Sequence, residues 1–159
     1  MELTTEYGLR EASTADLDAI VGLINRAFAV ERFFKNGDRT DAEMVRQNLK
    51  EGKFLLLSEK DEIVACVFVK LMGERAYLGT LSVDPAKQKS GVGSRMMQEA
   101  EEYCRAAGCK VLDIRIVNLR TELPAIYRKF GFVETGIESA EVVKNASQPI
   151  HFITMSKAL

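Results

Sequence analysis

The sequence has almost no net charge and no long apolar segment, and each absence excludes a class of partner. Its 159 residues include 22 Lys and Arg and 23 Asp and Glu, which gives a net charge of −1. A basic excess would indicate nucleic acid or an anionic membrane as the main partner, and the chain has none. The apolar runs fall far short of the ~20 residues that span a bilayer, and the first residues lack the pattern of a signal peptide. We therefore predict a cytoplasmic protein that binds neither nucleic acid nor a membrane.

Cysteine and histidine are also scarce, which argues against disulfides and metal sites. The chain has three cysteines and one histidine. Cys66, Cys104 and Cys109 show no C-x-x-C spacing, so we expect reduced thiols and no bound metal. Tryptophan is absent, yet hydrophobic residues make up 47% of the chain, as in ordinary globular proteins. Length and composition together predict a single domain over residues 1–159.

The spacing of apolar residues predicts a mixed α/β fold. Helical and strand-like periods alternate in the order β-α-α-β-β-β-α-β-α-β-β. Short turns join the three strands between residues 53 and 83 as antiparallel hairpins, and the β-α-β crossover that follows must place a parallel pair in the sheet. We predict an α/β (α+β) fold with a mixed, mostly antiparallel central sheet of about seven strands and helices on both faces.

Capping residues predict where several helices begin and end. Ser13 with Asp16 forms a capping-box-like start for the first helix, and Thr40 is expected to cap the second. Gly108 and Gly131 are expected to end two later helices in the left-handed conformation that glycine adopts easily.

The stretch QKSGVGS, residues 88–94, places two glycines between a strand that ends near Val83 and a helix that starts near Gly91. The first N–H groups of a helix lack partners and the helix dipole adds positive charge, so this loop suits an anion such as a pyrophosphate. It matches neither the P-loop GxxxxGK[ST] nor the Rossmann GxGxxG pattern. A helix start that prefers flexible residues explains the loop alone about as well.

Two segments together are more specific than the loop. Residues 88–93 match the signature Q/R-x-x-G-x-G/A, and NLRTELPAIYRKFGF, residues 118–132, places an Asn before a helix that carries a Tyr and ends in Gly-Phe. In both respects, and in element order over nearly all of the chain, the sequence resembles the GNAT superfamily of acyl-CoA N-acyltransferases. The resemblance implies an acyltransferase that moves an acetyl group from acetyl-CoA to a primary amine by direct attack in a ternary complex, without a metal.

The resemblance also implies roles for individual residues. Asn118 would reach the pantetheine or cysteamine portion of CoA, although a turn residue that ends a strand is the alternative. Tyr127 would contact CoA and act as the general acid, because a phenol can hydrogen-bond or protonate the departing thiolate; simple aromatic packing is the alternative. CoA would be bound through the backbone of Leu81, Ser82 and Val83 at the pantetheine arm and of Gln88, Lys89, Ser90, Gly91, Val92, Gly93 and Ser94 at the pyrophosphate.

The general base is not defined by the pattern. Some members of the family carry a Glu on the strand before the loop, but residues 77–83 contain no carboxylate. His151 is a candidate, because histidine is the usual side chain for a base near neutral pH, and it lies in a late strand near the expected acceptor pocket. Glu31, Asp38, Glu122 and a proton relay through water are alternatives.

The acceptor, a small-molecule or peptide amine, is also undefined. Phe33 and Phe34, in the loop between the first two helices, either wall its pocket or pack in the core. Exposed strand edges at the C-terminal end are compatible with a homodimer. Two other functions remain open at this point: a non-catalytic acyl-CoA-binding module on the same fold, and a nucleotide-binding domain that uses the glycine loop.

Overall fold

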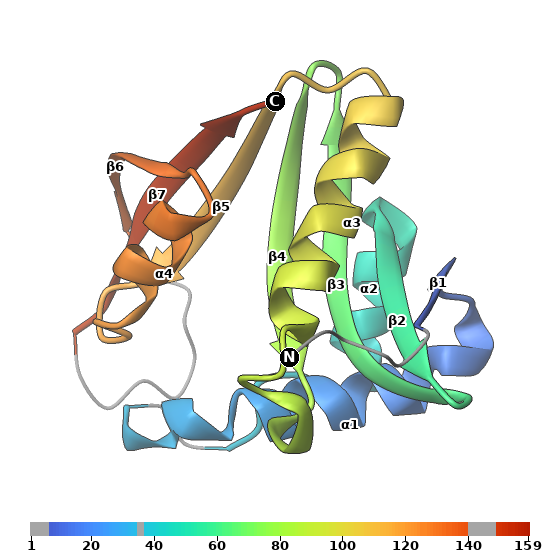
Figure 1. Cartoon of the computed structure of the whole chain (residues 1–159). Coiled ribbons are helices and arrows are strands. Elements are labelled where there is room, and N and C mark those ends of the chain that lie inside the picture. The colour runs from blue at the N-terminus through green and yellow to red at the C-terminus, as the bar shows by residue number, and fades with distance from the viewer. Residues whose placement is uncertain (1–6, 35–36, 140–148) are drawn as a thin grey trace.

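The computed structural model describes residues 7–34, 37–139 and 149–159, and in them one seven-stranded sheet. The strands lie in the order β1-β2-β3-β4-β5-β7-β6 (Figure 1). The β4–β5 pair is parallel and the other pairs are antiparallel, so the predicted mixed, mostly antiparallel sheet is confirmed. The strands are β1 (Gly8–Glu11), β2 (Lys53–Glu59), β3 (Glu62–Met72), β4 (Arg75–Val83), β5 (Val111–Val117), β6 (Val133–Ser139) and β7 (His151–Ala158).

Within the described ranges, four α-helices and three short 3₁₀ turns connect these strands, in the predicted order. The helices are α1 (Leu17–Ala27), α2 (Ala42–Glu51), α3 (Val92–Ala106) and α4 (Leu123–Lys129), and the 3₁₀ turns are Thr14–Asp16, Ala29–Phe33 and Pro85–Lys87. In Figure 1, α3 lies in front of the sheet and α1 and α2 lie behind it.

Two hydrophobic cores cover the two faces of the sheet, which explains why β2 and β3 are apolar without alternation. In β2, Phe54 and Leu56 pack with α1 and α2, whereas Leu55 and Leu57 pack on the side of α3. All four are at most 1% exposed. Because successive side chains of a strand point to opposite faces, a continuous apolar run is what a strand covered on both sides requires.

The predicted helix caps are confirmed except for one. Ser13 and Asp16 form a reciprocal capping box, and Gly108 and Gly131 adopt φ values of +90° and +99° just after α3 and α4. The prediction for α2 was wrong by one residue. Asp41, not Thr40, is the N-cap, since its side chain accepts a hydrogen bond from the N–H of Met44.

Thr40 has a different partner, which removes it from the capping position. Its backbone N–H and C=O are bound by the side-chain amide of Asn25 on α1, at 2.9 and 3.0 Å. This pair of hydrogen bonds ties the segment before α2 to α1. The N-cap of α2 is therefore the next residue, Asp41, which has the extended backbone that an N-cap needs.

The sheet divides between β4 and β5. These parallel strands pair only through Arg75, Ala76 and Tyr77, and Figure 1 shows them close at one end and widely separated at the other, where α1 lies. On the other side of β4, two residues, Thr80 and Leu81, oppose the single position between Cys66 and Phe68 of β3. Such a β-bulge bends its strand and leaves backbone groups outside the ladder.

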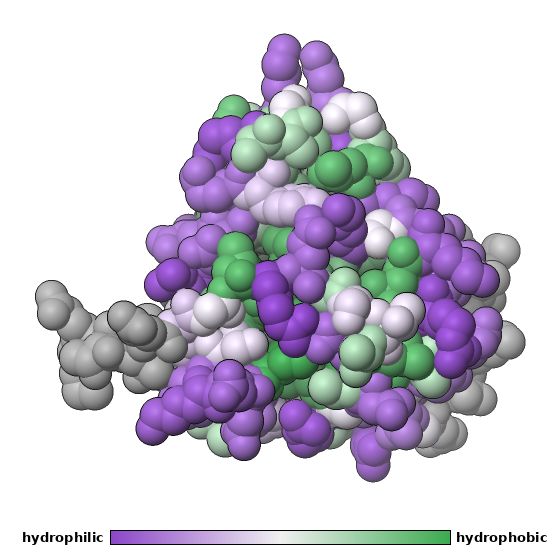
Figure 2. Space-filling model, turned by 90° about the vertical axis from the view of Figure 1, so that its right-hand side faces the viewer, coloured by the Kyte–Doolittle hydropathy of each residue, from purple (hydrophilic) through white to green (hydrophobic). Residues whose placement is uncertain are grey.

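The surface offers little that would bind a large apolar partner on the face viewed in Figure 2. Hydrophobic residues there form small areas separated by hydrophilic ones. At the far edge of the sheet, β6 is exposed along its whole length, including Val133 and Ile137. Among the residues that the structure describes, no helix is both long and apolar enough to cross a membrane.

Candidate active site

A cavity of about 800 Å³ occupies the gap between β4 and β5. Its walls include Leu78 to Leu81 of β4 and Ile114 to Val117 of β5. On one side of the sheet the cavity reaches Met97 of α3 and Tyr127 of α4, and on the other it reaches Phe28 and the segment before α2. It therefore connects the two faces of the sheet, so two ligands can approach the same point from opposite sides.

Thr80 lies at the bulge in β4 and carries two costly features. Its φ of +47° is in the left-handed region, which β-branched residues rarely adopt. Its Oγ1 is buried without a hydrogen-bond partner among the described residues. Strained backbone and unpaired buried polar atoms each cost about 1–3 kcal/mol and gather at functional sites. Ser82 supports the bulge, because its hydroxyl donates to the carbonyl of Thr80 at 2.8 Å.

Tyr127 is held by the way α4 ends. The N–H of Phe132 donates to the carbonyl of Tyr127 at 3.0 Å, and the N–H of Gly131 donates to that of Arg128 at 2.9 Å. This is a Schellman motif, in which the residue after the left-handed glycine packs against the last turn. The rings of Tyr127 and Phe132 pack edge to face at 5.7 Å. The motif Tyr-x-x-x-Gly-Phe thus has a structural reason to keep the phenol in place.

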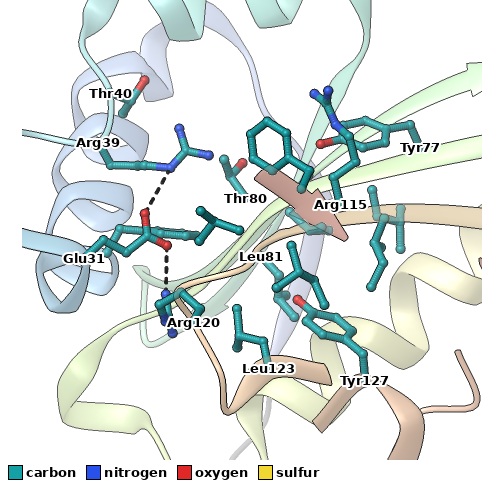
Figure 3. Close-up of a pocket in the computed structure, with 18 of the residues that line it drawn as sticks. Glu31, Arg39, Thr40, Tyr77, Thr80, Leu81, Arg115, Arg120, Leu123 and Tyr127 are labelled. Carbon is teal, nitrogen blue, oxygen red and sulfur yellow. Dashed lines mark hydrogen bonds and ion pairs between the residues drawn. The ribbon is translucent and has the colours of Figure 1, made fainter. Parts of the chain in front are cut away.

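The hydroxyl of Tyr127 projects from α4 toward β4 and Leu81 (Figure 3). Burial raises the pKa of Tyr127 to about 12, because desolvation penalises the phenolate. The phenol therefore stays protonated throughout the physiological range. It is a permanent hydrogen-bond donor at the cavity wall.

The glycine loop lies between β4 and α3, as predicted. Gly91 is the N-cap of α3 with φ +88°, and Lys89 also has a left-handed backbone at φ +64°. The next three residues, Val92, Gly93 and Ser94, present N–H groups that have no partner inside the helix. Val92 itself is fully buried in the core, so its contribution to a binding site is limited to its backbone.

Two side chains of the loop bind nearby backbone carbonyls. Gln88 donates to the carbonyl of Val83 at 3.3 Å, and the Ser90 hydroxyl donates to the carbonyl of Lys87. These bonds fix the loop rather than leave the side chains free for a ligand. Its exposed backbone is consequently the part that suits an anion.

A network of charges closes the cavity on the side of α1. The carboxylate of Glu31 lies 2.9 Å from Arg120 and 3.8 Å from Arg39 (Figure 3). Glu31 and Arg120 are mostly buried, with side chains 9% and 13% exposed. The pair joins the 3₁₀ turn after α1 to the loop after β5, two segments that belong to opposite halves of the divided sheet. Arg120 also contacts Glu122 at 3.1 Å.

The structure brings some of the predicted site residues to the cavity and leaves others outside it. Leu81, Tyr127 and Phe34 line the cavity. Phe34 is only 2% exposed, so it is a core residue that also lines the cavity. Phe33 is exposed, and the centres of the two rings lie 4.7 Å apart. Ser82 is fully buried.

Asn118 and His151 bind each other instead of lining the cavity. The side chain of Asn118 accepts from the N–H of His151 at 2.9 Å, and its backbone N–H donates to the carbonyl of His151 at 3.0 Å. The neighbours Ile150 and Phe152 line the cavity. His151 itself is not among the residues that line it. Nothing in this placement supports His151 as the base.

Sequence reasoning missed several cavity residues. Thr80 has no sequence signal, because the bulge that strains it depends on the pairing of β3 with β4. For Arg115 and Arg120 the sequence favours a solvated face, with contact to an acidic group of CoA or substrate as the alternative, and the structure places both at the cavity wall. The alternation of apolar and polar residues along β5 would have shown only that the side chain of Arg115 lies on the face of the strand opposite its apolar residues. The division of the sheet next to it is a tertiary feature.

The residues present fit an acyl-CoA. The bulge and the unpaired Thr80 hydroxyl offer hydrogen-bonding groups beside an open strand edge, and the start of α3 offers N–H groups to a pyrophosphate. Within the described residues, no three His, Cys, Asp or Glu side chains group as a metal ion would require.

Comparisons with known proteins place the chain among the acyltransferases. The profile of the family described as "Acetyltransferase (GNAT) family" matches residues 18–132. Because this is most of the chain, the chain belongs to that family, as its resemblance predicted.

Curated relatives are similar over part of the sequence. Streptothricin acetyltransferase of Streptomyces lavendulae is 27% identical over 92 residues, 58% of this chain and 49% of that protein. Glucosamine 6-phosphate N-acetyltransferase 1 of Oryza sativa subsp. japonica is 31% identical over 71 residues, 45% and 41% of the two chains. The chain spans about half the length of the curated relatives it matches.

Solved structures share the fold over nearly the whole length. The ribosomal-protein-S18-alanine N-acetyltransferase of Escherichia coli has a TM-score of 0.79 at 17% identity, covering 96% of this chain and 94% of that one. A GNAT family acetyltransferase of Elizabethkingia anophelis with acetyl-CoA bound has a TM-score of 0.73 at 17% identity, covering 96% and 98%. At these identities the likeness establishes the fold alone.

Proposed function

We propose that this chain, acting as one domain over residues 1–159, transfers an acetyl group from acetyl-CoA to a primary amine. The observation that carries the proposal is the cavity through the divided sheet. One side meets α3 and α4, and the other meets the segment between α1 and α2. Two substrates can therefore meet in a ternary complex without a covalent enzyme intermediate. The acceptor is a small-molecule or peptide amine.

Acetyl-CoA, when bound, supplies a thioester carbonyl; the amine nitrogen bonds to its carbon, and the bond to sulfur breaks. The chain's own contribution is binding and charge stabilisation. We assign the backbone of residues 88–94 to the pyrophosphate and that of residues 81–83 to the pantetheine arm. Of these, Leu81 is the one at both the bulge and the cavity. Asn118 stays a proposed CoA contact through its side-chain NH₂ group.

Tyr127 is the proposed acid, and its pKa refines what it does. A thiol has a pKa near 8.5, against about 12 for Tyr127. The raised pKa of the phenol makes complete proton transfer to the thiolate less favourable than a hydrogen bond to it. Tyr127 therefore stabilises the departing sulfur by a hydrogen bond in which the phenol keeps its proton, and the thiolate leaves as an anion or takes a proton from water.

The base is best assigned to water. The acidic side chains at the cavity wall already have partners: Glu31 has Arg120, and Asp38 lies 3.0 Å from Arg32. His151 is not part of the cavity wall. A cavity of about 800 Å³ has room for water molecules between polar groups. The amine thus loses its proton through a relay rather than to one dedicated side chain.

A Tyr127→Phe variant tests the assignment against its alternative, a module that binds acyl-CoA without turnover. We expect thiol release from acetyl-CoA with an amine panel to fall about 100-fold, while calorimetry shows unchanged CoA binding, because the ring still packs on Phe132. The matched control is Tyr103→Phe, which removes a hydroxyl bound to Glu11 at 3.0 Å outside the cavity wall. Equal turnover in both variants would rule out this hydrogen-bonding role of the Tyr127 hydroxyl.

Two further outcomes would overturn the function itself. Acetyl-CoA binding without thiol release for any amine would favour the binding module. Tight binding of ATP without binding of CoA would instead indicate a nucleotide-binding domain that uses the same loop.

A further inference from the structure

Two arginines lie on aromatic rings at the wall of the cavity. The Arg115 guanidinium carbon is 5.3 Å from the centre of the Tyr77 ring and 5.0 Å from that of Phe152, and the Arg39 guanidinium carbon is 5.2 Å from the Phe28 ring. All five residues line the cavity. A guanidinium on an aromatic face is held by cation–π attraction while the N–H groups at its edge remain free to bind.

The strands themselves set the position of Arg115. Tyr77 comes from β4 and Phe152 from β7, the two neighbours of β5. Gly79 makes room for the Tyr77 ring, since a Cβ at that position would lie 2.9 Å from the ring carbon Cε2. The guanidinium is therefore oriented by regular secondary structure before any ligand binds, which lowers the entropy cost of binding.

The acidic groups at the same wall are already engaged more closely. Asp38 lies 3.0 Å from Arg32, and Asp41 accepts from the N–H of Met44 at 2.9 Å. Glu31 lies 2.9 Å from Arg120.

The two stacked arginines have only loose contacts with acids. The closest carboxylate oxygens that the described residues offer are those of Glu138 at 3.5 Å from Arg115 and Glu31 at 3.8 Å from Arg39. The side chains of Arg115 and Arg39 are 45% and 32% exposed. In Figure 3, Thr80 and Leu81 of β4 lie between Arg39 on one side and Arg115 on the other. The wall beside the bulge thus presents guanidinium N–H groups that closer ion pairs have not occupied.

We propose that the acceptor amine carries an anionic group, a carboxylate or a phosphate, which Arg115 binds and Arg39 assists. The proposal rests on the proposed transfer reaction and names the chemical class of its acceptor. Planar guanidinium groups bind both anions through paired hydrogen bonds. The aromatic rings beside them accommodate the carbon skeleton, and the amine lies toward the bulge in β4.

Pairs of amines that differ only in the anionic group test the proposal on the full chain. Suitable pairs are 3-aminopropanoate and its amide, phenylalanine and its amide, and glucosamine 6-phosphate and glucosamine; the last separates phosphate from carboxylate. Thiol release gives kcat/KM for each, and calorimetry in the presence of CoA gives binding without turnover. Arg115→Gln removes the charge and Arg115→Lys keeps it without the planar fork. Arg105→Gln, on the outer side of α3 beside Glu102, is the control.

We expect the anionic member of at least one pair to be favoured by about 10- to 100-fold, the effect of a charge-assisted hydrogen bond. In Arg115→Gln the preference should disappear through KM, in Arg115→Lys it should be partly kept, and in Arg105→Gln it should be unchanged. A preference below about twofold in every pair, or one that survives in Arg115→Gln, would overturn the proposal. Arg115-dependent binding of the anionic amines without any thiol release would uphold it and overturn the transferase function instead.

Discussion

Replacing Thr80 by Val should make the protein more stable and less active. Valine has nearly the same shape and the same β-branch, so the left-handed backbone of residue 80, with φ +47°, stays equally strained in both proteins. The substitution therefore isolates the hydroxyl. In the wild type that hydroxyl is buried without a partner among the described residues.

The size of each effect follows from the hydrogen bond that is missing. An unsatisfied buried hydroxyl costs about 1–3 kcal/mol, so we expect the free energy of unfolding to rise by about 1 kcal/mol. For a chain of this length that is a rise in Tm of about 2–4 °C. If the hydroxyl bonds to a bound substrate, its loss should lower kcat/KM about tenfold, because 1.4 kcal/mol is a factor of ten.

Thermal and urea unfolding measure the first effect, and thiol release measures the second. Thr154→Val is the matched control. Its hydroxyl lies 2.9 Å from that of Thr135, so the same substitution there should be neutral or slightly destabilising, with activity unchanged. A Thr80→Val protein less stable than the wild type would show that the hydroxyl has a partner. Greater stability with undiminished activity would show that the unpaired hydroxyl plays no part in the reaction.

Two further predictions concern ion pairs. The bidentate pair with Arg10 holds the pKa of Asp16 at about 2, below its usual 3.8. A carboxylate whose pKa is lowered by folding stabilises the folded protein at pH values above its pKa in the unfolded chain, so urea unfolding should show about 1–2 kcal/mol of stability lost as pH falls from about 4 to 2. The Asp16→Asn variant should lose this pH dependence. At the cavity, the Arg120→Met variant leaves the buried Glu31 with the Arg39 guanidinium at 3.8 Å as its nearest cation. The Glu31→Gln variant, by contrast, leaves Arg120 its contact with Glu122 at 3.1 Å. Arg120→Met should therefore cost more, about 3 kcal/mol, and equal losses in urea unfolding would contradict this asymmetry.

Local signals in the sequence predicted most of the fold because they act over a few residues. In β5, for example, Leu112, Ile114 and Ile116 alternate with the polar Asp113 and Arg115, which is typical of a strand, and each of the three is at most 4% exposed. Glycines that need left-handed φ angles predicted where α3 and α4 end. The one shifted cap, at α2, failed because Asn25, fifteen residues earlier, bonds to the backbone of Thr40.

The candidate site was predictable only where a local motif forms it. The loop at residues 88–94 and the segment around Tyr127 are continuous in sequence, so a pattern can represent them. His151 appeared suitable as the only histidine, but Asn118 binds its backbone and His151 is not part of the cavity wall. That Glu31, Arg115 and Arg120 come together at one cavity wall could not be predicted, since it joins segments that are far apart in the chain.

The sequence by itself determined the order of elements, the two covered faces of the sheet and the family, because each depends on periodicity and short motifs. Only the tertiary structure decided that β4 and β5 part after Tyr77 and that the bulge leaves Thr80 strained beside a cavity. Strand pairing is a relation between residues distant in the chain, and no local pattern records where it stops. That interruption creates the cavity, and it brings Arg115 and Tyr127 to the place where the proposed reaction occurs.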